Sequence, residues 1–409
     1  MGMNLFIFNF KREIFSREAV SLITRKLTRF APLMGILFLI LLFPLVVLVL
    51  SGETVPVKTV IHRQQNSPRE VFWGRAYTGV DRYYKILSLK IREPGIIVLG
   101  SSRVNQIRAN FFKDSREFYN AAQTIERTED LRAVLRRIPR RKEPRLLLLG
   151  LDHWTFNDHW AGYKIHKISK REQGEPFWPF VLLSKWREIY QDFFADKFSL
   201  NALLSAEKRR DAIGLSAFMS HRGYRNDGSY CYSDVGSDYE VSSPTHIEFK
   251  HEMGRIADGG NRFEYGEAVS ARAVREVDQF LKECRARNIH VIGFLPPFAH
   301  VVYERLQEYG EKYDYMWKLE QSLKPLFEAY GFEFYDFSDL AGLGASDYET
   351  FDGFHITEKA YLRLCLAIAG ESQRLASYID VLLQKKRLDA TRGDLTVFLF
   401  EETPEEVKK

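Results

Sequence analysis

Cysteine is scarce in this sequence, with three residues among 409, and net charge is small. Cys231, Cys284 and Cys365 lie far apart, which excludes a dense disulfide framework and a Cys-x-x-Cys metal pair. Cys284 and Cys365 fall at apolar helical positions, so we expect both to be buried small hydrophobes. The net charge of +5 gives no sign of a nucleic-acid-binding protein. Apolar residues are plentiful at 45%, enough to build a large core.

Residues 31–50 contain no charged residue at all. Twenty apolar residues suffice for a helix that crosses a bilayer, and the run is too long for a signal-peptide core. Residues 1–30 are basic and place the N-terminus in the cytoplasm by the positive-inside rule. The sequence therefore predicts a cytoplasmic segment (1–30), a single transmembrane helix (31–50) in the inner (cytoplasmic) membrane, and a main domain that is periplasmic or extracellular.

Short apolar runs closed by turn residues recur along the rest of the chain. Runs of this kind are typical of strands buried on both faces of a parallel sheet. Helical patterns separate them, and this alternation predicts an α/β fold with a three-layer parallel sheet. Helices are expected over residues 104–112 and 128–138, from a cap at Ser270 through Cys284, in a region that runs to Tyr330, and from about residue 357. The predicted strands are Gly95–Gly100, Phe118–Ala122, Arg145–Asp152, Asn288–Leu295 and Gly331–Phe337.

The same patterning suggests the domain boundaries. Residues 51–92 are expected to form a stalk, and residues 93–152 together with 268–385 a catalytic domain. Between them, residues 153–267 are irregular and rich in tryptophan, too long for a loop, and indicate an inserted lid or substrate subdomain. Its aromatic residues either bind sugar rings or form the core of the insertion. Residues 386–409 form a charged tail, in which 395–400 is a candidate edge strand.

Ser102 follows the first strand of the predicted sheet. Loops at the carboxyl ends of parallel strands carry the chemistry of α/β proteins, and backbone N–H groups at the start of the next helix stabilise an oxyanion. Ser102 is therefore a candidate nucleophile. The alternative is that it serves only as a helix cap.

Asp352 and His355 lie three residues apart, just before the last predicted helix. This spacing on a turn places the carboxylate against one nitrogen of the imidazole and leaves the other free to face a hydroxyl, as a general base requires. The alternative is a helix-capping Asp beside a solvated His.

Together these motifs resemble those of the SGNH (GDSL-like) hydrolase superfamily. In that family a nucleophilic Ser closes a Gly-Asp-Ser turn after the first strand, and an Asp-x-x-His pair precedes the last helix. Gly100-Ser101-Ser102 matches the turn with Ser in place of Asp, which implies Ser102 as nucleophile; Asp352 and His355 match the pair. The resemblance implies a flavodoxin-like hydrolase fold and covers about residues 93–151 and 268–370.

The resemblance fails at the expected oxyanion donors, a Gly in a second motif and an Asn in a third. The second region reads Asn120-Ala121-Ala122-Gln123, and the third has Asp152 where the Asn belongs. An ionised Asp cannot donate a hydrogen bond. The candidate oxyanion donors are therefore Ser102, Asn120, Ala122, a protonated Asp152, and Asn157.

No metal or cofactor is expected. Asp152, His153, Asp158 and His159 are close in sequence, but they lack the i, i+4 histidine pairing of a metalloprotease helix.

The Gly-Ser-Ser variant on an anchored chain resembles the membrane-anchored branch that acts in cell-envelope acylation, which includes the D-alanine transfer protein. This implies a serine esterase or O-acyltransferase that moves an acyl group, such as acetyl, onto or off an extracytoplasmic envelope polysaccharide through an acyl-enzyme. It also implies a membrane-bound O-acyltransferase as partner. The alternative is a catalytically silent protein that binds polysaccharide or an export partner on the same fold, and the departure at Asp152 supports it.

Overall fold

The computed structural model describes residues 17–160, 174–204, 211–232 and 249–398, with only part of the side chains between residues 17 and 41. Its main sheet has five strands in the order β3-β2-β4-β8-β9, and every neighbouring pair is parallel. Each strand falls within one of the five predicted runs, so the predicted α/β fold with a parallel sheet is confirmed. The strands are β2 (Ile96–Gly100), β3 (Phe118–Ala122), β4 (Leu146–Gly150), β8 (His290–Leu295) and β9 (Glu333–Asp336).

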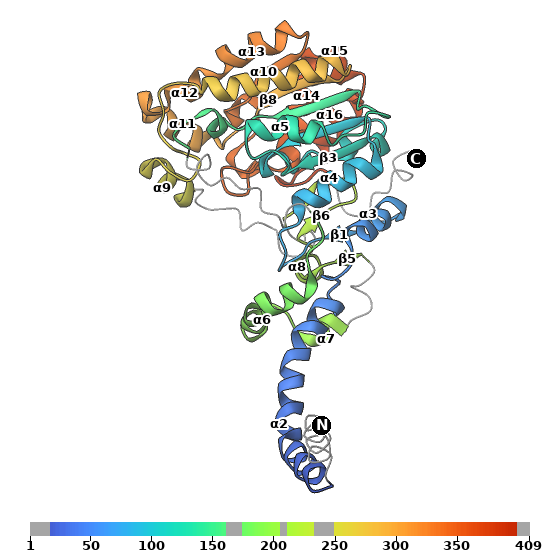
Figure 1. The fold of residues 1–409 in the computed structure, drawn as a ribbon. Helices are drawn as coiled ribbons and strands as arrows, with labels where there is room; N and C mark the ends of the chain where they lie inside the picture. Colours follow the sequence, from blue (N-terminus) through green and yellow to red (C-terminus); the bar gives the residue numbers. More distant parts are fainter. Residues whose placement is uncertain (1–16, 161–173, 205–210, 233–248, 399–409) are drawn as a thin grey trace, which may run out of the picture.

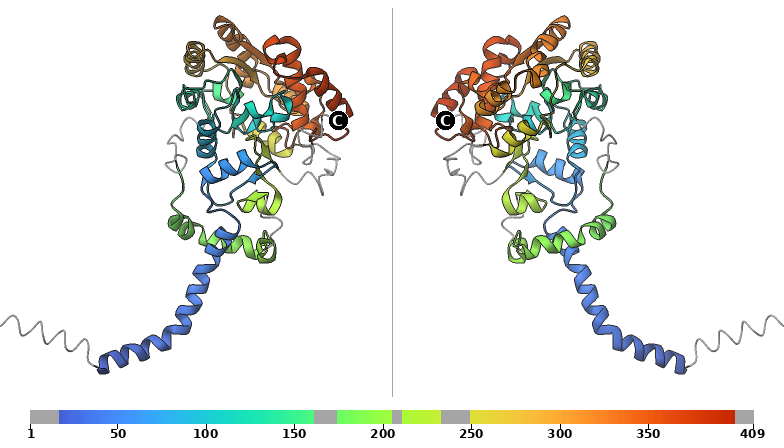
Figure 2. Two further views of the ribbon diagram at one scale, coloured as in Figure 1. Left: turned by 90° about the vertical axis from the view of Figure 1, so that its right-hand side faces the viewer. Right: turned by 90° about the vertical axis from the view of Figure 1, so that its left-hand side faces the viewer.

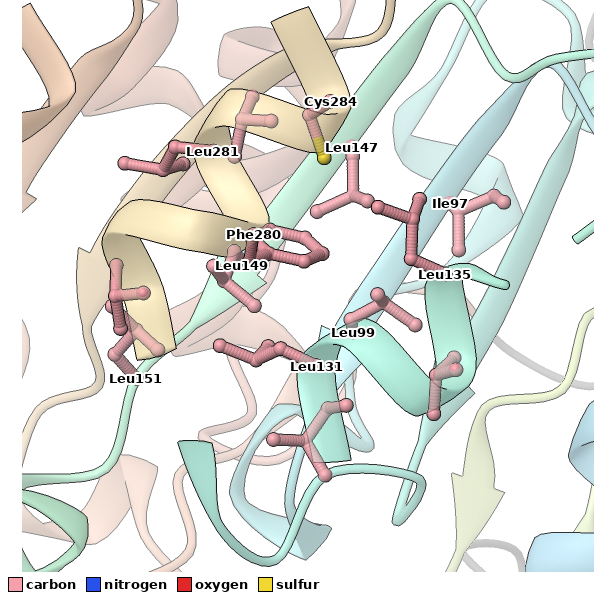
Figure 3. Packing of buried hydrophobic residues seen from close by; sticks show 14 of the residues in the cluster. Ile97, Leu99, Leu131, Leu135, Leu147, Leu149, Leu151, Phe280, Leu281 and Cys284 are labelled. Atoms are coloured by element: carbon pink, nitrogen blue, oxygen red, sulfur yellow. The ribbon is translucent and has the colours of Figure 1, made fainter. Parts of the chain in front are cut away.

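Helices cover both faces of this sheet (Figure 1). Ile97 and Leu99 point to one face and Ile96 and Val98 to the other, and both sets are buried, which explains the uninterrupted apolar runs. Figure 3 shows α5 and α10 packing their leucines and Phe280 onto the first face. That face is covered by α4 (Asp81–Arg92), α5 (Thr128–Leu135), α10 (Ala271–Ala286) and α13 (Leu319–Ala329), and the other by α14 (Glu358–Glu371), α15 (Gln373–Ala376) and α16 (Val381–Ala390).

The ends of two of these helices follow local capping rules. The Ser270 hydroxyl accepts the N–H of Ala273 at 3.3 Å at the start of α10, and the Thr357 hydroxyl that of Ala360 at the start of α14. Cys284 lies on the buried stripe of α10 and Cys365 inside α14; both are free and fully buried, as predicted.

The helix predicted over residues 104–112 is wrong. Two 3₁₀ turns stand there instead, η1 (Ser102–Val104) and η2 (Ala109–Phe111). The side-chain amide of Asn120 donates to the carbonyls of Val104 and Ile107 at 2.8 and 2.9 Å, so these carbonyls bond to a neighbouring strand rather than along a helix. The candidate edge strand at 395–400 is also not formed in its described part, residues 395–398.

Residues 51–92, for which we predict a stalk, contain α3 (Val57–Asn66), β1 (Phe72–Trp73) and α4. Strand β1 belongs to a second, small sheet in the order β5-β1-β6-β7, whose other strands come from the insertion. The main domain and the insertion are therefore joined through this small sheet. Its further strands are β5 (Ala212–Ile213), β6 (Gly223–Tyr224) and β7 (Tyr230–Cys231).

Figures 1 and 2 show α2 (Arg17–Leu50) extending away from the main domain, with α6 (Trp178–Phe194) and α7 (Leu200–Leu204) beside its upper end. Over the part of the chain that is described, no helix meets the length and apolarity needed to cross a membrane. The remaining elements are η3 (Ser115–Glu117), η4 (His153–Phe156), α8 (Leu215–Ser220), α9 (Lys250–Asp258), α11 (His300–Glu308), η7 (Gly310–Tyr313), α12 (Asp314–Trp317), η8 (Leu340–Leu343) and η9 (Asp347–Glu349).

Candidate active site

Ser102 stands at the carboxyl edge of the sheet, directly after β2. The turn requires glycine at position 100, because a Cβ there would lie 2.8 Å from the Val104 side chain and 3.1 Å from the carbonyl of Gly150 on the neighbouring strand. The cap of η1 is Ser101, whose hydroxyl accepts the N–H of Arg103 at 3.2 Å. The capping role that competes with a nucleophilic Ser102 is thus filled by its neighbour.

The segment between η9 and α14 forms a tight turn that carries Asp352 and His355. Asp352 Oδ1 accepts the backbone N–H groups of Phe354 and His355 at 3.0 and 2.6 Å, the local bonding expected of an Asp in a turn. Phe351 N–H donates to the carbonyl of His355 at 2.8 Å and closes the turn. Gly353 supplies the positive φ of 78° between them.

These two segments bring Ser102, His355 and Asp352 into one chain of hydrogen bonds. Ser102 Oγ lies 2.9 Å from His355 Nε2, and His355 Nδ1 lies 2.7 Å from Asp352 Oδ2. Since an ionised carboxylate only accepts, we assign the imidazole proton to Nδ1, which leaves Nε2 to accept from the serine. Burial acts to raise the pKa of Asp352, but its bonds with His355 and two backbone N–H groups outweigh this and lower it.

A buried arginine holds the turn that carries His355 against the end of β8. Arg103 Nε donates to the carbonyl of Phe354 at 3.1 Å, and its Nη2 donates to the carbonyls of Pro296 and Pro297 at 2.9 and 2.6 Å. The guanidinium also lies over the ring of Phe298, 4.2 Å from its centroid. One side chain, adjacent to the candidate nucleophile, therefore ties the histidine turn to the end of β8.

Asp152, the departure from the resemblance, is buried in the same layer as Arg103. Its Oδ1 lies 3.9 Å from Arg103 Nη1, and the carboxylate is 4% exposed. Burial raises the pKa of Asp152, an effect that Arg103 and the Ser101 hydroxyl oppose. Asp152 is thus a buried charge partner of Arg103.

The other side-chain candidates for the oxyanion donor are already engaged. Asn120 uses both amide hydrogens within the 104–107 turn, and its oxygen accepts the N–H of Ala122 at 2.8 Å. Asn157 donates to the carbonyls of Glu264 and Tyr265. In this structure Asn120, Ala122 and Asn157 therefore donate these N–H groups to other acceptors, which counts against their role as oxyanion donors. The backbone N–H of Ser102 is the candidate that this bonding leaves open.

A cavity of about 200 Å³ opens beside Ser102. Gln123 lines it at the end of β3 and has a φ of +64°, a left-handed conformation that a glycine adopts more easily. The full lining is Gly79, Asp81, Arg82, Ser101, Ser102, Gln123, Glu126 and Arg262.

Sequence reasoning missed three residues near the site that come from distant segments. Arg262, from the insertion, lines the cavity and holds its guanidinium 5.1 Å from the Trp154 ring centroid. Tyr232, also from the insertion, has its ring centroid 6.0 Å from that of His355. Arg103 was visible next to Ser102, but no sequence pattern reveals that it is buried. No local signal announces any of the three.

The residues considered for a metal do not converge. His153 is fully buried and bonds through Nε2 to Ser338 Oγ at 2.7 Å, while Asp158 accepts from Ser270 at 2.6 Å. Burial, and then the charge of Arg103, lower the pKa of His153 well below its ordinary value, so it is neutral. Within the described ranges, no group of three or more potential ligands is placed to hold a metal ion.

Comparisons of the chain with protein-family models, with curated proteins and with solved structures found no match.

Proposed function

We propose that this protein is a membrane-anchored serine esterase or O-acyltransferase that acts on an extracytoplasmic polysaccharide. The observation that carries the catalytic part is the hydrogen-bonded series Ser102–His355–Asp352 at the edge of a cavity, with distances of 2.9 and 2.7 Å. A serine in contact with an imidazole that is itself oriented by a carboxylate is the arrangement required for nucleophilic acyl transfer.

In the first step Ser102 Oγ attacks the carbonyl carbon of an acyl ester while His355 Nε2 takes the serine proton. Asp352 holds the ring and stabilises the imidazolium. The tetrahedral intermediate collapses, the bond to the leaving alcohol breaks, and His355 returns its proton to that alcohol. The acyl group remains on Ser102 as an ester.

In the second step His355 takes a proton from the acceptor, and the acceptor oxygen attacks the acyl-enzyme. Water as acceptor releases a carboxylic acid, and a sugar hydroxyl gives a new ester; both return Ser102 to its starting form. The backbone N–H of Ser102 is our oxyanion donor, joined by that of Gln123, because both residues line the cavity.

The strand order supports membership in the SGNH superfamily. Numbered along the chain, the five strands run 2-1-3-4-5, the flavodoxin-like order, and Ser102 follows strand 1 at the point where the order reverses. The Gly-Ser-Ser turn and the Asp-x-x-His pair occupy the two positions that the resemblance requires.

The anchor, the location and the partners rest on the sequence. Residues 31–50 carry no charge and follow a basic segment, which supports a single-pass anchor with the N-terminus in the cytoplasm. The main domain then faces the periplasm or the outside of the cell, where an envelope polysaccharide is the acceptor and a membrane-bound O-acyltransferase supplies the acyl group. These assignments follow the resemblance to the envelope acylation branch.

The rival is a catalytically silent binding protein on the same fold. It gains support from the hydrogen bonds that Asn120, Ala122 and Asn157 already make. Because of these bonds, an oxyanion at Ser102 would have only other backbone N–H groups as donors. Polysaccharide binding that persists in Ser102→Ala, together with no acyl turnover in the wild type, would establish the rival.

The triad is tested by labelling the full chain in detergent with a fluorophosphonate probe. We expect the wild type to label, Ser102→Ala to lose labelling, and His355→Ala to label at least about 100-fold more slowly, since general-base catalysis contributes about 10²–10⁴-fold. Equal labelling of all three proteins would remove the mechanism.

Two matched controls come from the chain itself. Ser377→Ala removes an exposed hydroxyl that donates to the carbonyl of Arg374 at 2.7 Å, outside the lining of the cavity. His300→Ala removes an imidazole that bonds to Asp339 at 2.9 Å elsewhere on the surface. Both should label at a rate close to that of the wild type, and loss of labelling in either would show that the assay does not report the triad.

A further inference from the structure

Two helices of the insertion, α6 and α7, lie beside the upper end of α2 (Figures 1 and 2), and neither contributes a residue to the lining of the cavity at Ser102. We call this pair the collar. One face of α6 packs against α2: Tyr190 donates its hydroxyl to the carbonyl of Ile40 at 2.8 Å, and the Phe43 ring lies 5.0 Å from the rings of Tyr190 and Phe193. Val47 and Leu48 of α2 are fully buried in the same cluster as Ile189 and Leu203 of the collar.

The opposite face of the collar is also apolar, but it is open. Leu183 and Phe194 are each 76% exposed. A helix that is apolar on both sides is normally buried in protein or in lipid, and exposed apolar patches mark interaction surfaces. The exposed side chains are Phe177, Phe180, Leu183 and Phe194 at α6 and Leu200 and Leu204 in α7.

Exposed apolar side chains also occur on α2 at the level of the collar. Val49, in the last turn of α2, is 55% exposed, and Leu45 one turn earlier is 41% exposed. Both lie in the uncharged run 31–50, within one helical turn of Val47 and Leu48, which pack against the collar. A water-soluble partner would cover the collar alone, whereas a lipid surface covers the collar and α2 together.

The polar residues of the collar suit a headgroup layer. Arg187 is exposed two helical turns beyond Phe180, on the same side of α6 as Leu183. A long cationic side chain among apolar ones reaches to lipid phosphates while its stem stays in the apolar layer.

We propose that the collar lies in the outer interface of the bilayer, with its open face among the lipid headgroups and upper acyl chains. It would act as a second membrane contact, which fixes the orientation of the main domain above the surface instead of leaving it on a single flexible anchor. Part of the insertion that we expect to be a lid or substrate subdomain thus serves the membrane. The proposal rests on the membrane anchoring proposed above and is independent of the triad.

The test uses the full chain in vesicles of phosphatidylcholine and phosphatidylglycerol. Because Cys231, Cys284 and Cys365 are buried, single introduced cysteines can be labelled selectively with a nitroxide. The test sites are Leu183→Cys and Phe194→Cys. We measure the collision of each nitroxide with oxygen, which concentrates in lipid, and with a water-soluble nickel chelate. Unlabelled wild type and circular dichroism control for background labelling and folding.

Two reference sites calibrate the measurement. Leu33→Cys, 61% exposed on α2, reports the anchor, and Leu382→Cys, 82% exposed on α16, reports water around the main domain. We expect oxygen to dominate at residues 33, 183 and 194, and the nickel chelate to dominate at residue 382.

Three results would overturn the proposal. If residues 183 and 194 behave like 382 while 33 reads lipid, the anchor stands and the collar fails. If 33 also behaves like 382, the anchor fails too, and probe labelling of Ser102 shows whether the catalytic proposal survives. If 183 and 194 exclude both reagents and show dipolar broadening between labelled chains, a second copy of the chain covers the collar.

Discussion

Replacement of Arg103 by methionine tests how the buried layer under the site is held together. The change removes three N–H donors from the carbonyls of Phe354, Pro296 and Pro297, and it removes the cation nearest to Asp152. Charged hydrogen bonds contribute about 1.5–3 kcal/mol each. Breaking a buried ion pair from one side costs about 3–5 kcal/mol. Because these losses overlap, we expect the free energy of unfolding to fall by about 4–6 kcal/mol.

A second substitution, at Asp152, measures how much of this loss comes from leaving the buried carboxylate without its cation. Asp152→Asn in the Arg103→Met background removes the unpaired carboxylate, so the double variant should be more stable than Arg103→Met by about 1–3 kcal/mol. Urea unfolding followed by circular dichroism measures both values. Arg141→Met is the matched control, because Arg141 is 74% exposed in its pair with Glu93 and should cost no more than about 1 kcal/mol.

The pH dependence of the stability of Arg103→Met is an independent test of the charge on Asp152. Burial already raises the pKa of Asp152 above its ordinary 3.8, and loss of Arg103 raises it further. The folded state then holds a proton that the unfolded chain releases, so the stability of Arg103→Met should fall, relative to the wild type, as the pH rises above the ordinary pKa of the carboxyl, 3.8. The double variant should lack this slope. Equal slopes in the two variants, or a double variant as unstable as the sum of the single changes, would refute the reasoning.

Activity distinguishes positioning from stability. Asp152→Asn should restore stability without restoring the rate of Ser102 labelling, because the bond from Arg103 to the Phe354 carbonyl, which holds the histidine turn, is still missing. Recovery of both together would mean that Arg103 acts on stability alone.

Two further predictions concern residues behind the sheet and at the cavity. Burial lowers the pKa of Lys85 from 10.5 to about 7, which corresponds to a cost of about 5 kcal/mol for holding the charged form in the folded state. Between about pH 7 and pH 10 the unfolded chain holds a proton that the folded state lacks, so Lys85 makes the free energy of unfolding rise with pH over this range. Lys85→Met should flatten that rise, as measured by urea titrations at several pH values. An unchanged pH profile would contradict the assignment. Gln123→Gly removes a side chain from a residue with left-handed backbone and should keep the free energy of unfolding within about 1 kcal/mol of the wild type. Because our mechanism uses only the backbone N–H of Gln123 for the oxyanion, probe labelling should be unchanged. A large loss of labelling at full stability would instead assign the role to its side chain.

Patterns confined to neighbouring residues predicted most of the fold. The five strands were visible because both faces of the sheet are buried, so Ile96 to Leu99 and Leu146 to Leu149 are apolar without interruption. Ser270 and Thr357 mark helix starts because a cap bonds three residues ahead. The failed helix at 104–112 shows the limit: its own residues favour helix, but the amide of Asn120, from the next strand, takes two of its carbonyls.

In the candidate site, too, the sequence predicted contacts between neighbouring residues but not contacts between distant segments. The spacing of Asp352 and His355 predicted their contact, because three residues of turn can place the carboxylate against the imidazole. The apolar run before Ser102 predicted a serine at a strand end. Only the tertiary structure decided that Ser102 meets a ring 253 positions away, that Asn120 and Asn157 donate to other acceptors, and that Arg262 reaches the cavity. Such contacts depend on the order in which strands pair and on which side chains bond across them. Neither is written in the spacing of residues along the chain.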